Sequence, residues 1–312
     1  MKTLIVGTGI IGVLYGWALS EADVDVTHLV RKGRVEKYLD GVPLDVLDER
    51  KGHPKNCLAS YALKCVDHIA TSDGYDLIVV PTNANQTEEA LKILAPAAGG
   101  ALFLIFSGNW EGTEFIDHLL PRDRYVLGYA DGGGTIRDGV YWTNLGFEVH
   151  LGLPTGGSLE ALETVKGLFA QAEIRADVQE DMVHWLWVHV AGVVGFAAGF
   201  ARDRDVSLYL KDKQLLQECI LSTRELYQLC RLRGVDVKKY PEVGMLNLPV
   251  WLVAGLFRWN FNHNEVMQRF TAHAASQSSL LETKSYFTGM TKTAQELDYH
   301  MPHTESLGAF LN

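Results

Sequence analysis

The stretch that decides the fold is Met1–Arg34, which reads MKTLIVGTGIIGVLYGWALSEADVDVTHLVRKGR. Its pattern predicts an apolar strand, a glycine turn, a helix and a second strand, over residues 3–6, 7–12, 13–19 and 24–30. This arrangement binds a pyrophosphate at the N-terminus of the helix. A GxGxxG pattern alone is weak evidence, but between a strand and a helix it strongly indicates dinucleotide binding.

The glycines of this turn have separate tasks. Gly7 allows a tight turn, Gly9 lets the backbone approach the phosphates, and Gly12 lets the helix pack closely on the strand. The cofactor contacts that we expect from the whole turn are Gly7, Thr8, Gly9, Ile10, Ile11 and Gly12.

The end of the second strand indicates which cofactor is bound. An NAD site usually has Asp or Glu about twenty residues after the glycines, to hold the ribose hydroxyls. This chain has Arg31 and Lys32 there, followed by Gly33 and Arg34, and no carboxylate. A guanidinium can bind a 2′-phosphate with two hydrogen bonds, whereas a carboxylate would repel it. The sequence therefore predicts NADP(H), although two basic residues in a solvated turn would read the same.

Composition narrows the class of protein. The 312 residues suffice for two domains, and 47% hydrophobic with 21% charged residues is typical of a globular protein. The net charge of −10 argues against nucleic-acid or anionic-membrane partners. The four cysteines show no metal-binding spacing, so we expect no metal site. We expect free thiols in the cytoplasm, because no secretory signal is evident at the start.

One apolar segment has the length of a membrane span. Residues 182–201 contain no Asp, Glu, Lys or Arg and include Gly195-x-x-x-Gly199. His184, His189 and two tryptophans within the segment favour a buried helix of a soluble domain instead.

The remaining chain predicts two domains, a nucleotide-binding domain over residues 1–176 and an all-helical domain over 177–312. In the first, alternating strands and helices predict a doubly wound α/β sheet whose ligand lies at the carboxyl ends of the strands. The expected strands are 42–47, 58–66, 76–80, 101–106, 125–128 and 141–151; the helices are 87–94, 111–120 and 159–172; a flexible turn is expected at 131–134. In the second domain we expect helices over 181–200, 212–233, 249–257, 265–287 and 304–311. We expect the substrate to meet the nicotinamide in a cleft between the domains.

These features resemble the ketopantoate reductase family, the NADPH-dependent 2-dehydropantoate 2-reductases, over nearly the whole chain. The dinucleotide turn and Arg31 match the family's own turn and its 2′-phosphate arginine. The resemblance implies further cofactor contacts near Asn83, where the family has a lysine, at Gln86, and at Ser107, where the family has an asparagine. We add Gly134, from the run of glycines, to the expected cofactor contacts.

The chain departs from the family in the long apolar helix. The family has a proton-donating lysine followed by two asparagines, and at those positions this chain has Trp187, Ala191 and Gly195. The resemblance places Glu282 near the cofactor. His184 lies one helical turn before Trp187 and could face the same cleft. Glu282 and His184 are therefore the candidate proton donors, although core or surface roles suit both.

Three functions stay open. The first is an NADPH-dependent reductase of a 2-oxo acid or related carbonyl compound, in pantothenate biosynthesis if that compound is ketopantoate. If Trp187 lines the cleft, a bulkier or less polar substrate is expected. The second is an NADP(H)-binding sensor with little turnover. The third is an opine-type or hydroxy-acid dehydrogenase, whose His-Asp pair is not evident. The sequence leaves the oligomeric state open, a homodimer included.

Overall fold

The computed structural model describes residues 1–53, 55–203 and 205–311, and their packing divides the chain into two compact units. Unit 1 is formed by Met1–Ser107, Gly112–Met182 and Arg269–Ala272; unit 2 is formed by Gly108–Glu111, Val183–Gln268 and His273–Asn312. The domain boundary after residue 176 stays a prediction, because a unit of packing need not be a domain that folds alone.

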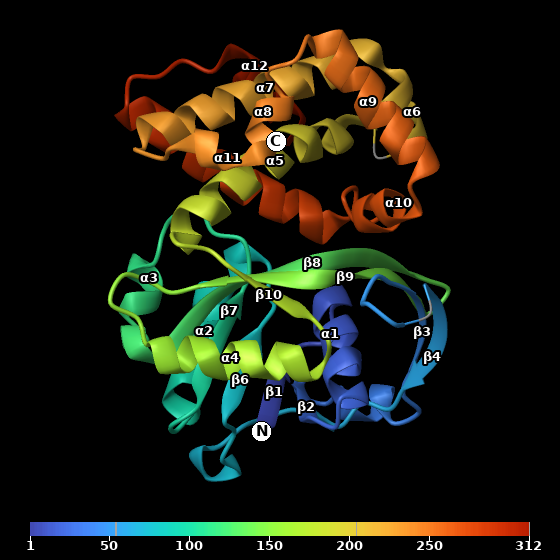
Figure 1. The fold of residues 1–312 in the computed structure, drawn as a ribbon, viewed down its shortest axis with the longest axis vertical. Coiled ribbons are helices and arrows are strands. Elements are labelled where there is room, and N and C mark those ends of the chain that lie inside the picture. The colour runs from blue at the N-terminus through green and yellow to red at the C-terminus, as the bar shows by residue number, and fades with distance from the viewer. Residues whose placement is uncertain (54, 204, 312) are drawn as a thin grey trace. The chain divides into compact units, whose positions relative to one another are not determined.

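Unit 1 is built on one mixed, mostly parallel sheet (Figure 1). In the described residues its order is β4-β3-β9-β8-β7-β6-β1-β2-β5, with β10 paired to β9. Of the strand pairs that the structure describes, β8–β9 and β3–β4 are antiparallel and the others are parallel. The strands are β1 (Lys2–Val6), β2 (Asp25–Leu29), β3 (Val42–Asp48), β4 (Asn56–Tyr61), β5 (Cys65–Val66), β6 (Leu77–Val80), β7 (Leu102–Phe106), β8 (Tyr125–Arg137), β9 (Val140–Gly152) and β10 (Arg175–Val178).

The helices of unit 1 are α1 (Ile10–Glu21), α2 (Ala84–Leu94), the short α3 (Glu114–Asp117) and α4 (Leu159–Gln171). Tyr15 of α1 and Phe169 of α4 are buried in one apolar core with residues of the sheet. The chain leaves β1 toward β2 on one side and reaches β6 on the other, so the strand order reverses at β1. In open α/β sheets, ligands bind at the carboxyl ends of the strands beside such a reversal. The predicted doubly wound α/β fold is confirmed.

The prediction of a flexible turn at the run of glycines, residues 131–134, is wrong. Residues 131–134 do not form the expected flexible turn but lie within β8, with a bulge between Ala130 and Gly132. A side chain at Gly133 would lie 3.1 Å from the Cα atom of Phe270, so the glycine lets a distant segment pack on the strand. Tertiary packing therefore overrides the turn preference of glycine here.

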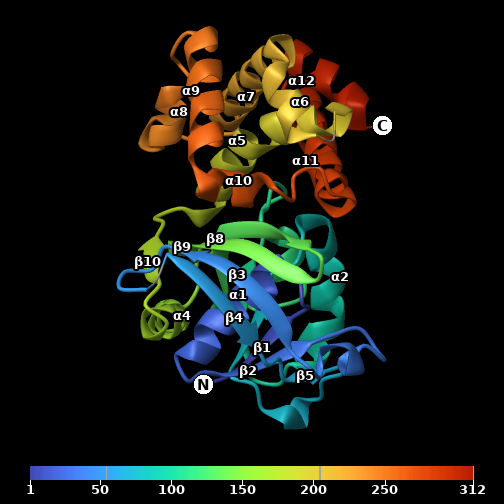
Figure 2. The same ribbon diagram turned by 90° about the vertical axis from the view of Figure 1, so that its right-hand side faces the viewer.

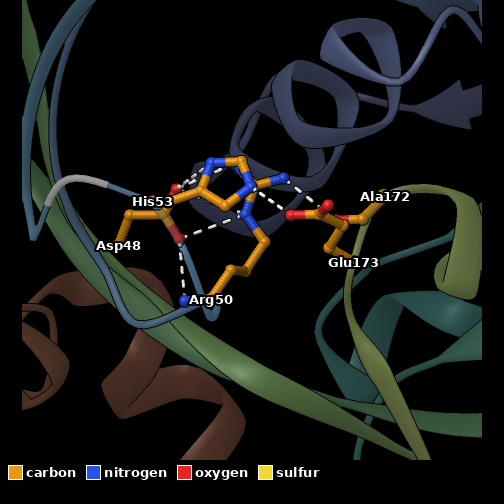
Figure 3. A network of polar contacts seen from close by, with 5 residues as sticks. All are labelled: Asp48, Arg50, His53, Ala172 and Glu173. Carbon is orange, nitrogen blue, oxygen red and sulfur yellow. Dashed lines mark hydrogen bonds and ion pairs between the residues drawn. The ribbon is translucent and has the colours of Figure 1, made fainter.

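A buried polar network links the end of β3 to the residues that follow α4 (Figure 3). Arg50 donates to both carboxylate oxygens of Asp48, with Nη2 2.8 Å from Oδ2, and donates through Nη1 to the Ala172 carbonyl oxygen. Both charged side chains of this pair are 1% exposed. His53 extends the network with a contact of 2.6 Å to Glu173. The network is a structural anchor, because each of its buried charges is paired.

Unit 2 is helical in its described residues (Figure 2). Its helices are α5 (Met182–Asp203, whose first residue belongs to unit 1), α6 (Val206–Lys211), α7 (Lys213–Leu232), α8 (Pro241–Met245), α9 (Val250–His263), α10 (Glu265–Thr271, whose last residues belong to unit 1), α11 (Gln277–Glu296) and α12 (Pro302–Gly308). Helix α7 is central, since it packs against α9, α11 and α12 and has buried residues along its whole length.

Helix α5 is long and apolar enough to cross a membrane, but 61% of its most apolar window is buried inside the protein. The glycines of α5 lie where this helix packs closely on another helix. A side chain at Gly195 would lie 2.2 Å from Thr223 Oγ1 of α7, and one at Gly199 would lie 2.8 Å from Cys219 Sγ. The GxxxG pattern therefore packs α5 tightly on α7, as the prediction of a buried helix required.

Several element boundaries were predicted wrongly. The expected helix over 265–287 is two helices, α10 and α11, because the Ser276 hydroxyl accepts from the Ser279 N–H and starts a new helix. The expected helix over 111–120 is reduced to α3. The expected strand over 58–66 is split into β4 and β5, and the short, polar β10 was missed.

Candidate functional site

The glycine turn of unit 1 has the geometry of a phosphate-binding site. Gly7 has φ +87°, a conformation that favours glycine, and Gly9 precedes the first residue of α1. At both positions the direction of a side chain is open, with nothing within 4 Å. At Gly12 a side chain would lie 3.1 Å from the Gly7 carbonyl oxygen and 3.4 Å from Ile5. The turn is thus open to a ligand at Gly7 and Gly9 and closely packed at Gly12.

Three side chains hold this turn in place. His28 of β2 is buried, and its Nδ1 donates to the Gly7 carbonyl oxygen at 3.0 Å. Its Nε2, 3.0 Å from the Tyr61 hydroxyl, accepts a hydrogen bond from it. Burial lowers the pKa of His28, which favours this neutral form. The Thr8 hydroxyl donates to the Tyr38 hydroxyl oxygen at 2.6 Å, and the Thr8 carbonyl accepts from Tyr141 at 2.9 Å.

The basic turn after β2, residues 31–34, is exposed at Arg31 and Lys32. No hydrogen bond or ion pair of these two side chains occurs within the described ranges. Sequence reasoning missed Asp67, which follows β5, the parallel neighbour of β2. The Asp67 carboxylate accepts from the Gly33 N–H at 3.0 Å, and this bond, with a smaller contribution from His68, lowers the pKa of Asp67. A carboxylate therefore does lie beside the basic turn, supplied by a different strand.

Strand β6 lies next to β1 in the sheet and β7 lies next to β6, and since all three are parallel, their carboxyl ends are at the same edge. Asn83 is the N-cap residue of α2, and the exposed Gln86 lies in the first turn of that helix. The Thr87 hydroxyl donates to Ser107 Oγ at 3.3 Å and thereby connects the exits of the two strands. Three of the predicted cofactor contacts, Asn83, Gln86 and Ser107, are therefore gathered at one edge of the sheet.

Gly134 is explained by packing. Its φ is +147°, and a side chain there would lie 2.3 Å from the Trp142 carbonyl oxygen of β9. This close approach of two strands accounts for glycine at the position without a ligand, so a role of Gly134 in cofactor binding stays a prediction.

In unit 2, the 108–111 loop (Gly108–Glu111) packs among three helices. A side chain at Gly108 would lie 2.1 Å from the Tyr286 hydroxyl of α11, and the Tyr286 hydroxyl donates to Glu282 at 3.2 Å. Trp110 Nε1 donates to Thr293 Oγ1 at 3.1 Å on the same helix. The structure thus brings the half-buried Glu282 close to this loop and adds Tyr286, which the sequence did not single out.

Trp187 of α5 is part of an aromatic and cationic stack on this loop. The ring centres of Trp187 and Trp110 are 6.1 Å apart. The guanidinium carbon of Arg233, at the C-terminal end of α7, lies 3.3 Å from the Trp187 ring centre and 4.4 Å from that of Trp110. Arg233 Nη1 donates to the Trp110 carbonyl oxygen at 2.9 Å. We call these three residues the tryptophan–arginine stack.

The neighbours of Trp187 on α5 have different surroundings. The His184 ring centre is 5.2 Å from that of Trp187, so the predicted pair does lie side by side. Ala191 is fully buried, and Gly195 is in contact with α7. The positions one and two turns after Trp187 therefore have no room for polar side chains. His189 stacks on Trp185, with ring centres 4.9 Å apart.

Comparison with known proteins shows a similarity to one family over part of the chain. Residues 3–154 match the family described as ketopantoate reductase PanE/ApbA. A 2-dehydropantoate 2-reductase of Pyrococcus abyssi (strain GE5 / Orsay) is 27% identical over 194 residues. The match covers 60% of this chain and 59% of that protein, so the aligned part of this chain spans about three-fifths of the relative's length.

Solved structures extend the likeness of fold to the whole chain. A 2-dehydropantoate 2-reductase from Geobacter metallireducens GS-15 has a TM-score of 0.74 at 16% identity and covers 100% of this chain and 99% of its own. The ternary structure of D-mandelate dehydrogenase with NADH and anilino(oxo)acetate has the same TM-score at 14% identity and covers 100% of this chain and 97% of its own. At such low identities, the likeness is one of fold.

Proposed function

We propose that this chain, whose residues 3–154 match the ketopantoate reductase family, is an NADPH-dependent reductase of a 2-oxo acid with an apolar or aromatic side chain. The observation that carries the proposal is the open glycine turn before α1, with an exposed basic turn at the end of the neighbouring strand.

The residues present suit a dinucleotide. The turn leaves space at Gly7 and Gly9, and the first N–H groups of α1 have no partner within the helix and can donate to a pyrophosphate. Arg31 and Lys32 would hold the 2′-phosphate, by charge-assisted hydrogen bonds. When bound, the reduced cofactor supplies a hydride to the carbonyl carbon of the substrate.

The protein has to supply a proton to the substrate oxygen, which becomes negative as its carbon is reduced. Glu282 and His184 are the proposed donors, and each would have to be protonated before the reaction. The Tyr286 hydroxyl, which donates to Glu282, would position the carboxyl group or pass its proton on. The tryptophan at position 187 has an indole N–H that is far too weak an acid for this task.

The preference for an apolar or aromatic substrate rests on the surroundings of Trp187. The two indoles and the His184 ring form a continuous aromatic group. The D-mandelate dehydrogenase with a similar fold was solved with anilino(oxo)acetate, an oxo acid that bears an aromatic group. We expect weak turnover of the small, polar ketopantoate, since α5 has neither an ammonium nor an amide side chain at 187, 191 and 195.

The test combines cofactor affinity with turnover. We expect NADPH to bind more tightly than NADH, and Arg31→Ala to weaken NADPH binding by roughly 1.5–3 kcal/mol, the range for a hydrogen bond to a charged group. The exposed Lys51→Ala is the control for loss of one positive charge elsewhere in unit 1. NADPH oxidation is then followed with ketopantoate, pyruvate and phenylglyoxylate. Equal affinities of the wild type for NADPH and NADH would contradict the cofactor assignment.

A second function is favoured by one observation, the tryptophan at the position of the family's lysine. An NADP(H)-binding sensor with little turnover would need no proton donor there. Tight NADPH binding without oxidation by any of the three carbonyl compounds would favour the sensor over the reductase.

A further inference from the structure

Arg233 has an unusual environment for an arginine that is partly withdrawn from water. It caps the C-terminal end of α7, and its side chain lies in the tryptophan–arginine stack, half-buried. Burial lowers the pKa of Arg233, because the charged guanidinium is less stable in this environment than in water. Such a cost is usually offset by a carboxylate partner.

No carboxylate forms an ion pair with Arg233 within the described residues. The carboxylates of Glu111 and Glu296 and the thiol of Cys230 act on the guanidinium only through weaker electrostatic effects. A guanidinium has five N–H groups, and the one hydrogen bond of Arg233 to the described residues runs from Nη1 to the Trp110 carbonyl oxygen. The Nε and Nη2 groups are therefore available as a pair of parallel donors, the geometry that binds a carboxylate.

A second donor in the stack also has no acceptor. Trp187 Nε1 is buried and has no hydrogen-bond partner in the part of the chain that the structure describes. A buried N–H without an acceptor costs about 1–3 kcal/mol, which a ligand oxygen would recover. The two observations concern different residues on different helices, and both indicate an anionic or carbonyl ligand.

We propose that Arg233, held between Trp110 and Trp187, binds the carboxylate of the substrate, and that the two indoles favour an aromatic or apolar group beside it. This assignment rests on the proposed 2-oxo acid reductase function and names the group that binds its substrate's charge. An anchor from another element is needed because Ala191 of α5 is fully buried and Gly195 is packed against α7. A guanidinium on an indole face loses little freedom when it binds, because the cation–π contact already fixes its plane.

The alternative is that Arg233 only fastens the 108–111 loop to α7. Arg224 of the same helix has such a role, since its Nε and Nη2 donate to the carbonyl oxygens of Leu246 and Leu248. Arg233 differs because its Nε and Nη2 have no such acceptors in the part of the chain that the structure describes. A fastening role predicts a loss of stability on mutation, whereas a binding role predicts a loss that depends on the charge of the ligand.

The experiment compares an acid with its uncharged ester. Phenylglyoxylate and methyl phenylglyoxylate are titrated into the wild type, Arg233→Ala and Arg233→Lys by calorimetry with NADP⁺ present, and KM and kcat are measured with NADPH. For Arg233→Ala we expect the Kd and KM of the acid to rise on the order of 10- to 100-fold, and those of the ester to change less than about threefold. Arg233→Lys should lie between, because an ammonium keeps the charge but loses the paired donors.

The exposed Arg231→Ala on the same helix is the matched control and should leave both ligands unaffected. The NADPH affinity and the unfolding midpoint of each variant establish that it is folded. Equal losses for acid and ester, an unchanged Kd for the acid, or no binding of the acid to the wild type would each overturn the role of Arg233. If the wild type binds the acid but oxidises NADPH with neither compound, the reductase function fails while the binding data still decide on Arg233.

Discussion

Arg50 of unit 1 and Arg233 of unit 2 are both shielded from water and both lie near a tryptophan, yet their environments are opposite. Arg50 lies 5.3 Å from the Trp17 ring centre and uses Nε, Nη1 and Nη2 for hydrogen bonds to Asp48 and Ala172 (Figure 3). Among the described residues, Arg233 donates only through Nη1, to the Trp110 carbonyl oxygen, and its guanidinium lies against the indoles of Trp110 and Trp187.

This difference separates a structural charge from one that is available for binding. A buried ion pair with every donor satisfied has nothing left to offer a ligand, and removing one partner leaves the other uncompensated. A half-buried cation with free donors stabilises the folded protein less and can bind an anion. The number of unsatisfied donors therefore distinguishes the two arginines better than burial alone.

The largest expected effect is on stability, at Arg50. Arg50→Met should lower the free energy of unfolding by about 3–5 kcal/mol, because Asp48 would stay buried without its partner. Urea denaturation at pH 7 measures the change. The exposed pair of Lys64 with Asp25 gives the control, and Lys64→Ala should cost less than about 1 kcal/mol.

The double variant Arg50→Met, Asp48→Leu sharpens this prediction. If the uncompensated charge causes the loss, replacing both partners with apolar side chains should recover much of it. A double variant as unstable as Arg50→Met alone would instead assign the loss to the bond with the Ala172 carbonyl.

Features that depend on neighbouring residues in the sequence could be predicted, whereas features that depend on contacts between distant residues could not. The glycine turn was predicted because its residues are consecutive and each requirement is local. The tryptophan–arginine stack could not be predicted, since Trp110, Trp187 and Arg233 come from a loop and two helices, and each fits an ordinary core or surface pattern. The contact between Gly133 and Phe270 has the same long-range character, which is why the glycine run by itself predicts a turn.

The next prediction concerns pH and the buried His28, which resembles Arg50 because both of its ring nitrogens are bonded. Burial lowers the pKa of His28 in the folded protein, while the unfolded chain titrates near 6.5. Below that value the unfolded state binds more protons. The stability from neutral His28 is therefore present above pH 6.5 and is lost as the pH falls toward the folded pKa.

Unfolding free energies at pH 5.5 and 7.5 test this dependence. The wild type should lose more stability than His28→Gln over this interval, by at most about 1.4 kcal/mol for one proton over one pH unit. The glutamine amide can still donate to the Gly7 carbonyl but does not titrate. The same pH dependence in both proteins would show that His28 does not contribute to it.

The smallest expected effect is at Asp67, the carboxylate beside the exposed basic turn. If Arg31 and Lys32 bind a 2′-phosphate, the charge of Asp67 opposes that phosphate, but water and salt screen the repulsion. Asp67→Asn keeps an acceptor for the Gly33 N–H and removes the charge. We therefore expect NADPH to bind about two- to fivefold more tightly at low salt, with less gain at high salt and no change for NADH.

Asp67→Ala, which removes both the charge and the acceptor, should gain less, because the turn loses its tether at Gly33. A tighter NADH complex in Asp67→Asn would mean that Asp67 acts on the whole dinucleotide, and weaker NADPH binding would mean that its charge holds the basic turn in place.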